Sequence, residues 1–258
     1  MLHHHEIAID AARCIGCGLC RDDCPAGNIV LNGKTAAVLA QDCIMCAHCV
    51  AICPQAAVSI SGFDEEPRPV GQPATLDPDR LLAAIGERRS VRRFADRPVS
   101  EKAVARVIEA GRLTPTGKNA QDVSYVVVRE RLERCEALAV RLFRRLMPFV
   151  RLVDETARRT EIDEHFFFKK APVAIVVVSK DKVNAALAAS NMELMAQAHG
   201  LGVLYSGFFA MAVNHSRALR RELGLSRGQK AVATLVLGHP AVRYRRTAPK
   251  EPAVVALR

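Results

Sequence analysis

The chain has no tryptophan, only three tyrosines and no apolar run near the roughly 20 residues that a membrane-spanning helix requires. The longest candidates, such as Ala171–Ser179, have the length of a buried strand. The first ten residues also lack the apolar core of a secretory signal. We therefore expect a cytoplasmic protein that does not enter the membrane.

Two nucleotide-binding motifs are also missing. No G-x-G-x-x-G follows an expected strand, and no G-x-x-x-x-G-K-[ST] occurs, so neither a dinucleotide fold nor a P-loop is indicated. A hydrophobic fraction of 50% with 15 Gly and 13 Pro excludes low-complexity and fibrous classes. The 258 residues suffice for one large domain or two modest ones.

Charge is distributed unevenly along the chain. Residues 1–61 contain three basic and five acidic side chains, a net charge of −2, and the rest of the chain carries 34 − 22 = +12. A basic balance indicates nucleic acid, an acidic protein partner or an anionic cofactor. The arginines are dispersed along expected helices, and no zinc-finger or RNP pattern occurs, so the sequence does not indicate nucleic acid as a partner.

Eight of the nine cysteines form two runs that repeat after 29 residues (43 − 14 = 29), each followed by proline. The pattern is C-x2-C-x2-C-x3-C-P, in which three thiolates surround one iron–sulfur cluster and the fourth completes the other. Gly16 and Gly18 leave room for backbone close to a cluster. Residues 1–61 thus resemble a bacterial ferredoxin with two [4Fe–4S] clusters. The expected ligand sets are Cys14, Cys17, Cys20 and Cys53 for one cluster, and Cys43, Cys46, Cys49 and Cys24 for the other.

Other uses of these cysteines fit less well. Disulfides require an oxidising compartment, and zinc usually takes two C-x2–4-C pairs rather than two triplets with a trailing Cys-Pro. The ninth, Cys135, shares a helical face with Leu132, Ala139 and Leu142, which indicates a buried structural thiol. The His3–His5 run is set aside in the functional argument.

A second domain is expected over residues 79–258, after a proline-rich linker at 62–78. Apolar periodicity predicts helices from Asp77 or Asp79 to about residue 89, from Ser100, over 131–158 with a break at Pro148, and over 183–199 and 217–223. It predicts strands at 125–128, 172–179 and 231–237. Helices around a few central strands predict an α/β sandwich of about 180 residues.

Arg88, Arg89, Ser90 and Arg92 place several guanidiniums and a hydroxyl within five residues, a composition that suits a phosphate dianion. A solvated basic turn is the alternative. With the segments ERRSVRRF (87–94), RLTPTGKNAQ (112–121), SNMELMAQAHGLGVLYSG (190–207) and LGHPAVRYRRTAP (237–249), the sequence resembles the FMN-dependent nitroreductase family over about residues 80–250.

The resemblance implies an α+β fold, with a mixed, mainly antiparallel sheet between helices, and a homodimer with FMN at the subunit interface. It implies that the first segment holds the FMN phosphate and ribityl chain, that a partner subunit's second segment lies along the isoalloxazine, that the third approaches the flavin N5 and that the fourth adds phosphate contacts. The implied FMN-binding residues are Arg88, Arg89, Ser90, Arg92, Pro115, Thr116, Gly117, Asn119, Tyr205, Ser206, Gly207, Arg243, Arg245 and Arg246. Many family members continue the second segment as N-x-Q-P-W, whereas here it reads Asn119-Ala120-Gln121-Asp122-Val123.

Clusters that pass single electrons and a flavin that also transfers hydride complement each other. We expect an FMN-dependent oxidoreductase that passes low-potential electrons from a donor such as ferredoxin or flavodoxin to a nitro compound, quinone, enoate or flavin. An electron-transfer module without turnover, and a nucleic-acid-binding iron–sulfur protein, are the alternatives. No catalytic side chain is assigned, because Phe166–Phe168 is more typical of core, and His165 and His199 of structural or surface positions.

Overall fold

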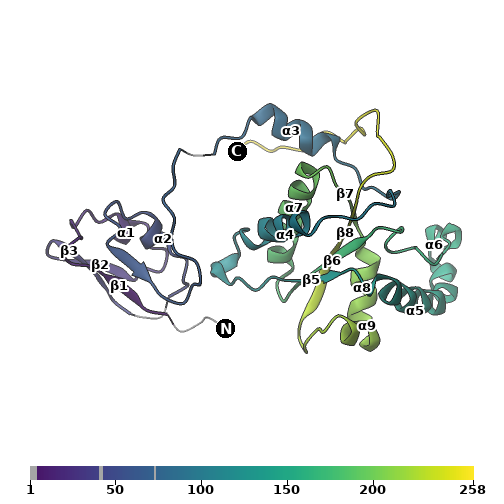
Figure 1. Cartoon of the computed structure of the whole chain (residues 1–258), viewed down its shortest axis with the longest axis horizontal. Helices are drawn as coiled ribbons and strands as arrows, with labels where there is room; N and C mark the ends of the chain where they lie inside the picture. Colours follow the sequence, from purple (N-terminus) through teal and green to yellow (C-terminus); the bar gives the residue numbers. More distant parts are fainter. Residues whose placement is uncertain (1–4, 41–42, 73) are drawn as a thin grey trace. The chain divides into compact units, whose positions relative to one another are not determined.

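The computed structural model describes residues 5–40, 43–72 and 74–258. The chain forms two compact units, one of residues 1–75 with 116–120 and the other of residues 76–115 with 121–258. Figure 1 shows both units with labels on most of their helices and strands. The expected boundaries at residues 61 and 78 stay a prediction.

The cysteine-rich unit is an internal duplication with the same 29-residue offset as its cysteines. Its two antiparallel pairs join β1 with β4 and β2 with β3, and each half adds one short helix. The offset carries α1 onto α2 and the start of β2 onto the start of β4. The bounds are β1 (Ile7–Ile9), α1 (Leu19–Asp22), β2 (Ile29–Asn32), β3 (Thr35–Val38), α2 (His48–Ala51) and β4 (Val58–Ile60).

The duplication extends to the backbone angles. Gly16 and Gly18 have φ of 68° and 78°, and the residues 29 positions later, Met45 and Ala47, have φ of 51° and 57°. Glycine is obligatory at the first of these positions because a Cβ on Gly16 would lie 2.4 Å from the carbonyl oxygen of Lys34. The second half adopts the same left-handed turns without glycine, at a steric cost.

The second unit is built on a four-stranded sheet in the order β5-β6-β8-β7 with antiparallel pairing. Alternate residues of the buried central strand β6 point to opposite faces. Ala174, Val176 and Val178 join one apolar core, and the intervening valines and isoleucine join the other. The strands are β5 (Ser124–Val128), β6 (Val173–Ser179), β7 (Gly202–Tyr205) and β8 (Lys230–Gly238).

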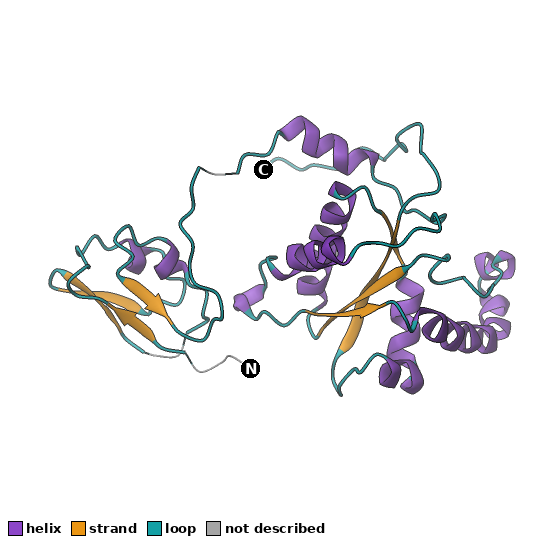
Figure 2. Ribbon diagram, viewed as in Figure 1, coloured by secondary structure: helices purple, strands orange, loops and turns teal. Residues whose placement is uncertain are grey.

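Helices cover both faces of this sheet, as Figure 2 shows. The core on one face includes residues of α4 and α7, and the core on the other includes residues of α5, α6, α8 and α9. Helix α3 (Pro78–Glu87) buries no residue. The others are α4 (Glu101–Arg112), η1 (Gly117–Asn119), α5 (Leu132–Val153), α6 (Glu155–Arg159), α7 (Lys182–Ala198), α8 (Gly207–His215) and α9 (Arg217–Glu222). The expected sandwich of helices around a mainly antiparallel sheet is confirmed.

One expected boundary was wrong. Helix α5 runs through Pro148 and ends at Val153, where Asp154 caps α6 by accepting a hydrogen bond from the Ala157 N–H. Proline has no N–H, so one carbonyl in the preceding turn loses its hydrogen-bond partner. The carboxyl-terminal part of α5 is exposed, so water can bond to that carbonyl and the helix continues. Strand β7 and helix α8 had not been predicted as separate elements. Within the described ranges, no helix is long and apolar enough to span a membrane.

Candidate functional site

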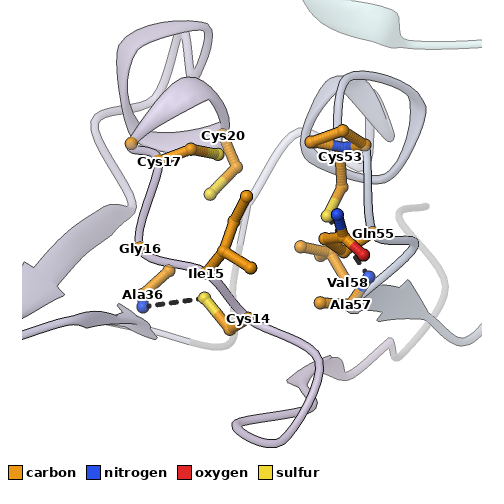
Figure 3. Close-up of a pocket in the computed structure, with 12 residues that line it drawn as sticks. Cys14, Ile15, Gly16, Cys17, Cys20, Ala36, Cys53, Gln55, Ala57 and Val58 are labelled. Carbon is orange, nitrogen blue, oxygen red and sulfur yellow. Dashed lines mark hydrogen bonds between the residues drawn. The ribbon is translucent and has the colours of Figure 1, made fainter.

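The cysteine-rich unit gathers the two predicted ligand sets around two separate cavities. Cys14, Cys17, Cys20 and Cys53 line one cavity, drawn in Figure 3. The other set, Cys24, Cys43, Cys46 and Cys49, lines the other. Each cavity thus combines three cysteines of one run with the fourth cysteine of the other, which is the exchange that the motif predicts.

Backbone N–H groups point at the sulfurs of these cysteines. Asn28 N donates to Cys24 Sγ at 3.3 Å, and Ala57 N, 29 residues later, donates to Cys53 Sγ at 3.2 Å. Ala36 N lies 3.4 Å from Cys14 Sγ, as the dashed line in Figure 3 shows. Such hydrogen bonds stabilise negative charge on sulfur, as a thiolate-bound cluster requires.

Burial, in contrast to these hydrogen bonds, disfavours the negatively charged thiolate form of the free cysteines. It raises the pKa of Cys20, and it raises that of Cys49 to about 11. These thiols become ligands only if a positive ion compensates the thiolate charge, which iron does. In residues 5–40, 43–72 and 74–258, no three His, Cys, Asp or Glu side chains converge tightly enough for a single metal ion. Sulfurs spread around a cavity fit a cluster better than one zinc ion.

In the second unit, three of the four nitroreductase-like segments meet. Ser90 forms a parallel bridge with Val203 of β7, and the Val91 N–H donates to the Val203 carbonyl at 2.9 Å. The Tyr244 hydroxyl donates to the Ser90 carbonyl at 3.3 Å, which brings the segment of Arg243, Arg245 and Arg246 to the same place. The two arginine-bearing segments thereby meet at Ser90, next to β7, which Ser206 and Gly207 follow.

Arg88 contacts a residue that the sequence analysis did not single out. Its Nη1 donates to Glu193 Oε1 at 2.5 Å, and the Glu193 side chain is only 6% exposed. Tyr205 donates its hydroxyl to the Ala189 carbonyl at 2.9 Å, and burial, reinforced by the Glu193 carboxylate, raises the Tyr205 pKa. Glu193 is the only acidic residue of α7, and this isolated charge in an apolar helix is the signal that could have identified it.

Arg89 has an unused donor. Its Nη1 donates to the Gly86 and Arg88 carbonyls, while its Nη2 is buried without a hydrogen-bond partner in the described part of the chain. Leaving a buried guanidinium N–H unpaired is costly, and a phosphate oxygen would satisfy it. Arg92 Nη1 makes a long contact of 3.4 Å to the Ser90 carbonyl. These features fit a phosphate-bearing cofactor.

The second nitroreductase-like segment is divided between the units. Pro115 belongs to the second unit, whereas Thr116, Gly117 and Asn119 group with the cysteine-rich unit. Asn119 Nδ2 donates to the carbonyls of Ile44 and Met45 at 3.0 and 2.8 Å. These three residues therefore group with a different unit from the arginine segment at residues 87–94, and their place at the flavin stays a prediction.

The departure from the family pattern at Asp122 has a structural role. Its carboxylate accepts hydrogen bonds from Ser179 Oγ at 2.6 Å and Asn184 Nδ2 at 2.8 Å, which ties β5 to the end of β6 and the start of α7. Burial opposes the charge, but these bonds and the Asp181 N–H outweigh it and lower the Asp122 pKa. Asp122 thus fixes the loop that precedes β5.

The expectation that the phenylalanine run belongs to the core is confirmed for Phe167 and Phe168, each 1% exposed. Their backbone N–H groups donate to the buried carboxylate of Glu136 at 2.9 and 2.8 Å. Cys135 is fully buried, and burial raises its pKa to about 11, which confirms a core thiol. His165 Nδ1 lies 3.7 Å from Glu136 Oε2.

Comparison with known proteins agrees with this arrangement. The family model described as nitroreductase family matches residues 85–239, and the one described as 4Fe-4S dicluster domain matches residues 6–54. The nitrobenzene nitroreductase of Ectopseudomonas oleovorans is 26% identical over 193 residues, which cover 60% of this chain and 84% of that protein.

Two solved structures share the fold of the second unit. A nitroreductase with bound FMN from Desulfitobacterium hafniense superposes with a TM-score of 0.58 at 20% identity, over 69% of this chain and 97% of its own. A nitroreductase with bound FMN from Bacteroides fragilis gives a TM-score of 0.56 at 20% identity, over 69% and 98%. The nitroreductase model alone covers more than half of the chain. The chain therefore belongs to the nitroreductase family of oxidoreductases and carries a 4Fe-4S dicluster domain ahead of the family's fold.

Proposed function

We propose that two [4Fe–4S] clusters of this oxidoreductase deliver low-potential electrons to FMN, and that FMN passes them to a small electrophile. The acceptor is a nitro compound, a quinone, an enoate or another flavin. The observation that carries the proposal is that two complete sets of four cysteines line two cavities in a chain of the nitroreductase family. Cysteines committed to iron suit a reducing compartment such as the cytoplasm.

The second unit would hold FMN through the arginine segment. Arg89 offers a buried donor without a partner, and Arg243, Arg245 and Arg246 supply further charge nearby. The FMN named in the two solved relatives supports the same cofactor here. Bound FMN supplies the conversion between single-electron and hydride chemistry. The chain's own residues bind its phosphate and position it, and no side chain needs to act as a general acid.

The proposal includes two partners. A separate reduced ferredoxin or flavodoxin is the expected donor, and a second copy of the chain completes the flavin site at a subunit interface. Exposed apolar side chains support a homodimer, since Phe149, Leu152 and Val153 on α5 are 70%, 74% and 86% exposed in the single chain. Sedimentation analysis of the cofactor-loaded protein tests this, and a monomer with full FMN content would contradict it.

Cofactor content is the first test. Anaerobic purification should give about eight iron, eight sulfide and one FMN per chain. Cys17→Ser should lower the iron content while FMN remains, and Cys135→Ser, which changes a cysteine outside both sets, should leave iron and FMN unchanged. Stoichiometric zinc, or an absence of flavin, would overturn the proposal.

Turnover is the second test. The reduced protein is mixed anaerobically with nitro compounds, quinones, enoates and flavins, and reoxidation of FMN and clusters is followed by absorbance. Multiple turnovers with reduced ferredoxin as donor support an enzyme. Reduction of FMN without any acceptor-dependent turnover would instead assign the chain as an electron-transfer module.

A further inference from the structure

A histidine side chain lies against one of the predicted cluster ligands. His5 is only 6% exposed, and its Nε2 lies 3.1 Å from Cys43 Sγ. The neighbouring backbone is fixed, because Glu6 N donates to Ser61 Oγ at 2.8 Å and the Ser61 N–H donates to the Glu6 carbonyl at 2.9 Å. These bonds extend the β1–β4 pairing and hold His5 beside Cys43.

The contact breaks the symmetry of the duplicated unit. The 29-residue offset makes Cys14 the counterpart of Cys43, and Cys14 Sγ accepts a hydrogen bond from the backbone N–H of Ala36. Cys43 Sγ accepts one from the backbone N–H of Met45 at 3.3 Å and also faces the imidazole. Four cysteine sulfurs line each cavity, but Cys43 Sγ has an additional side-chain partner.

The imidazole must be the donor once the cluster is bound, because a thiolate ligated to iron has no proton to give. Reduction adds negative charge to the cluster and its sulfurs, so a hydrogen bond to a ligand sulfur stabilises the reduced state more than the oxidised one. The effect is an increase in the reduction potential of the cluster concerned.

We propose that His5 raises the reduction potential of the cluster held by Cys43, Cys46, Cys49 and Cys24 above that of the other cluster. His5 is thereby a positioning and tuning residue that gives electron transfer between the clusters a downhill direction toward Cys43. The inference rests on the proposed cluster ligation. It assigns to a single side chain one difference between the two duplicated ligand sets.

The test uses the full-length protein with both clusters and FMN in place. Anaerobic redox titration followed by electron paramagnetic resonance measures the two cluster potentials in the wild type and in His5→Phe, which keeps a planar ring without a donor. At the wild-type midpoint of the affected cluster, we expect the reduced-to-oxidised ratio to fall roughly fivefold, the effect of one net hydrogen bond. The other cluster should keep its potential and serve as the internal control.

Two variants and one spectroscopic measurement sharpen the result. His5→Gln retains an N–H donor and should recover part of the lost potential. His48→Phe removes a histidine that lines the cavity of this ligand set but faces Asp23 Oδ2 at 3.2 Å, so it should shift the potential less. Electron–nuclear double resonance on protein with isotope-labelled histidine should detect a coupled nitrogen in the wild type that His5→Phe loses.

Equal shifts of both clusters, no shift in His5→Phe, or an equal shift in His48→Phe would each overturn the inference. If His5→Phe loses a cluster, the His5→Gln potential and the nitrogen coupling in the wild type decide the question. Failure of the underlying function is recognised separately, because a wild-type protein without two clusters would show it by iron content before any titration.

Discussion

The Arg88–Glu193 ion pair predicts an asymmetric response to removal of either partner. The Glu193 side chain is 6% exposed, whereas that of Arg88 is 40% exposed. Arg88→Met leaves a carboxylate buried without its charged partner. Glu193→Gln leaves an arginine that already reaches water and retains an amide oxygen to accept from it. We therefore expect the first variant to destabilise the second unit more than the second variant does.

The magnitudes follow from burial. Breaking a fully buried pair by removing one partner costs about 3–5 kcal/mol. Because Arg88 is partly solvated, this figure is reduced to roughly 2–3 kcal/mol for Arg88→Met, and to about 1 kcal/mol for Glu193→Gln. The double variant should cost less than the two single variants together, by roughly 1 kcal/mol, because its two changes remove the same interaction.

Urea unfolding at a fixed, saturating FMN concentration measures these costs, since a bound ligand itself adds stability. The matched control is Arg112→Met, which breaks an exposed pair with Glu109 and should change stability by no more than about 1 kcal/mol. If Glu193→Gln proves at least as destabilising as Arg88→Met, or if the double variant is additive, the assignment of Glu193 as a buried charge held by Arg88 is refuted.

Three further predictions concern other parts of the fold. Because Gly18 and Ala47 share a left-handed conformation, Gly18→Ala should lower the stability of the cysteine-rich unit by about 1 kcal/mol and Ala47→Gly should raise it by roughly 0.5 kcal/mol. Cluster loss in urea, followed by visible absorption, should be faster in Gly18→Ala and slower in Ala47→Gly than in the wild type. Effects of equal sign in the two variants would contradict this. Cys135, with its pKa raised to about 11 by burial, should resist iodoacetamide in the folded protein and react after unfolding, and peptide mass spectrometry showing rapid native labelling would disprove its burial. Burial raises the pKa of Glu136 above its ordinary 4.5, so the protonated form favours folding and this contribution is lost as pH rises through the raised value. The stability of the wild type relative to Glu136→Gln should then fall as pH increases above about 4.5. Urea midpoints of both proteins measured across pH test this, and a stability difference that stays constant or rises with pH would contradict it.

Much of the fold was predictable because its signals are local. The unbroken apolar run at β6 indicated a central strand, and Asp77 and Ser100 are helix caps at the places expected. Pro148 misled the helix prediction because the cost of a missing N–H depends on whether the freed carbonyl reaches water, which tertiary burial decides. Strand β7 was missed because its four residues lie between a glycine-rich turn and a helix, too few for periodicity to register.

The sequence by itself determined the cysteine chemistry, since ligands spaced two and three residues apart need only local chain geometry to surround a cluster. It also placed the arginine segment as a phosphate-binding candidate. Only the tertiary structure decided that Arg88 is held by Glu193, 105 residues away, and that His5 reaches Cys43 across 38 residues. Contacts at such separations depend on how sheets and helices close around a core, and this long-range packing leaves no periodic trace in the chain.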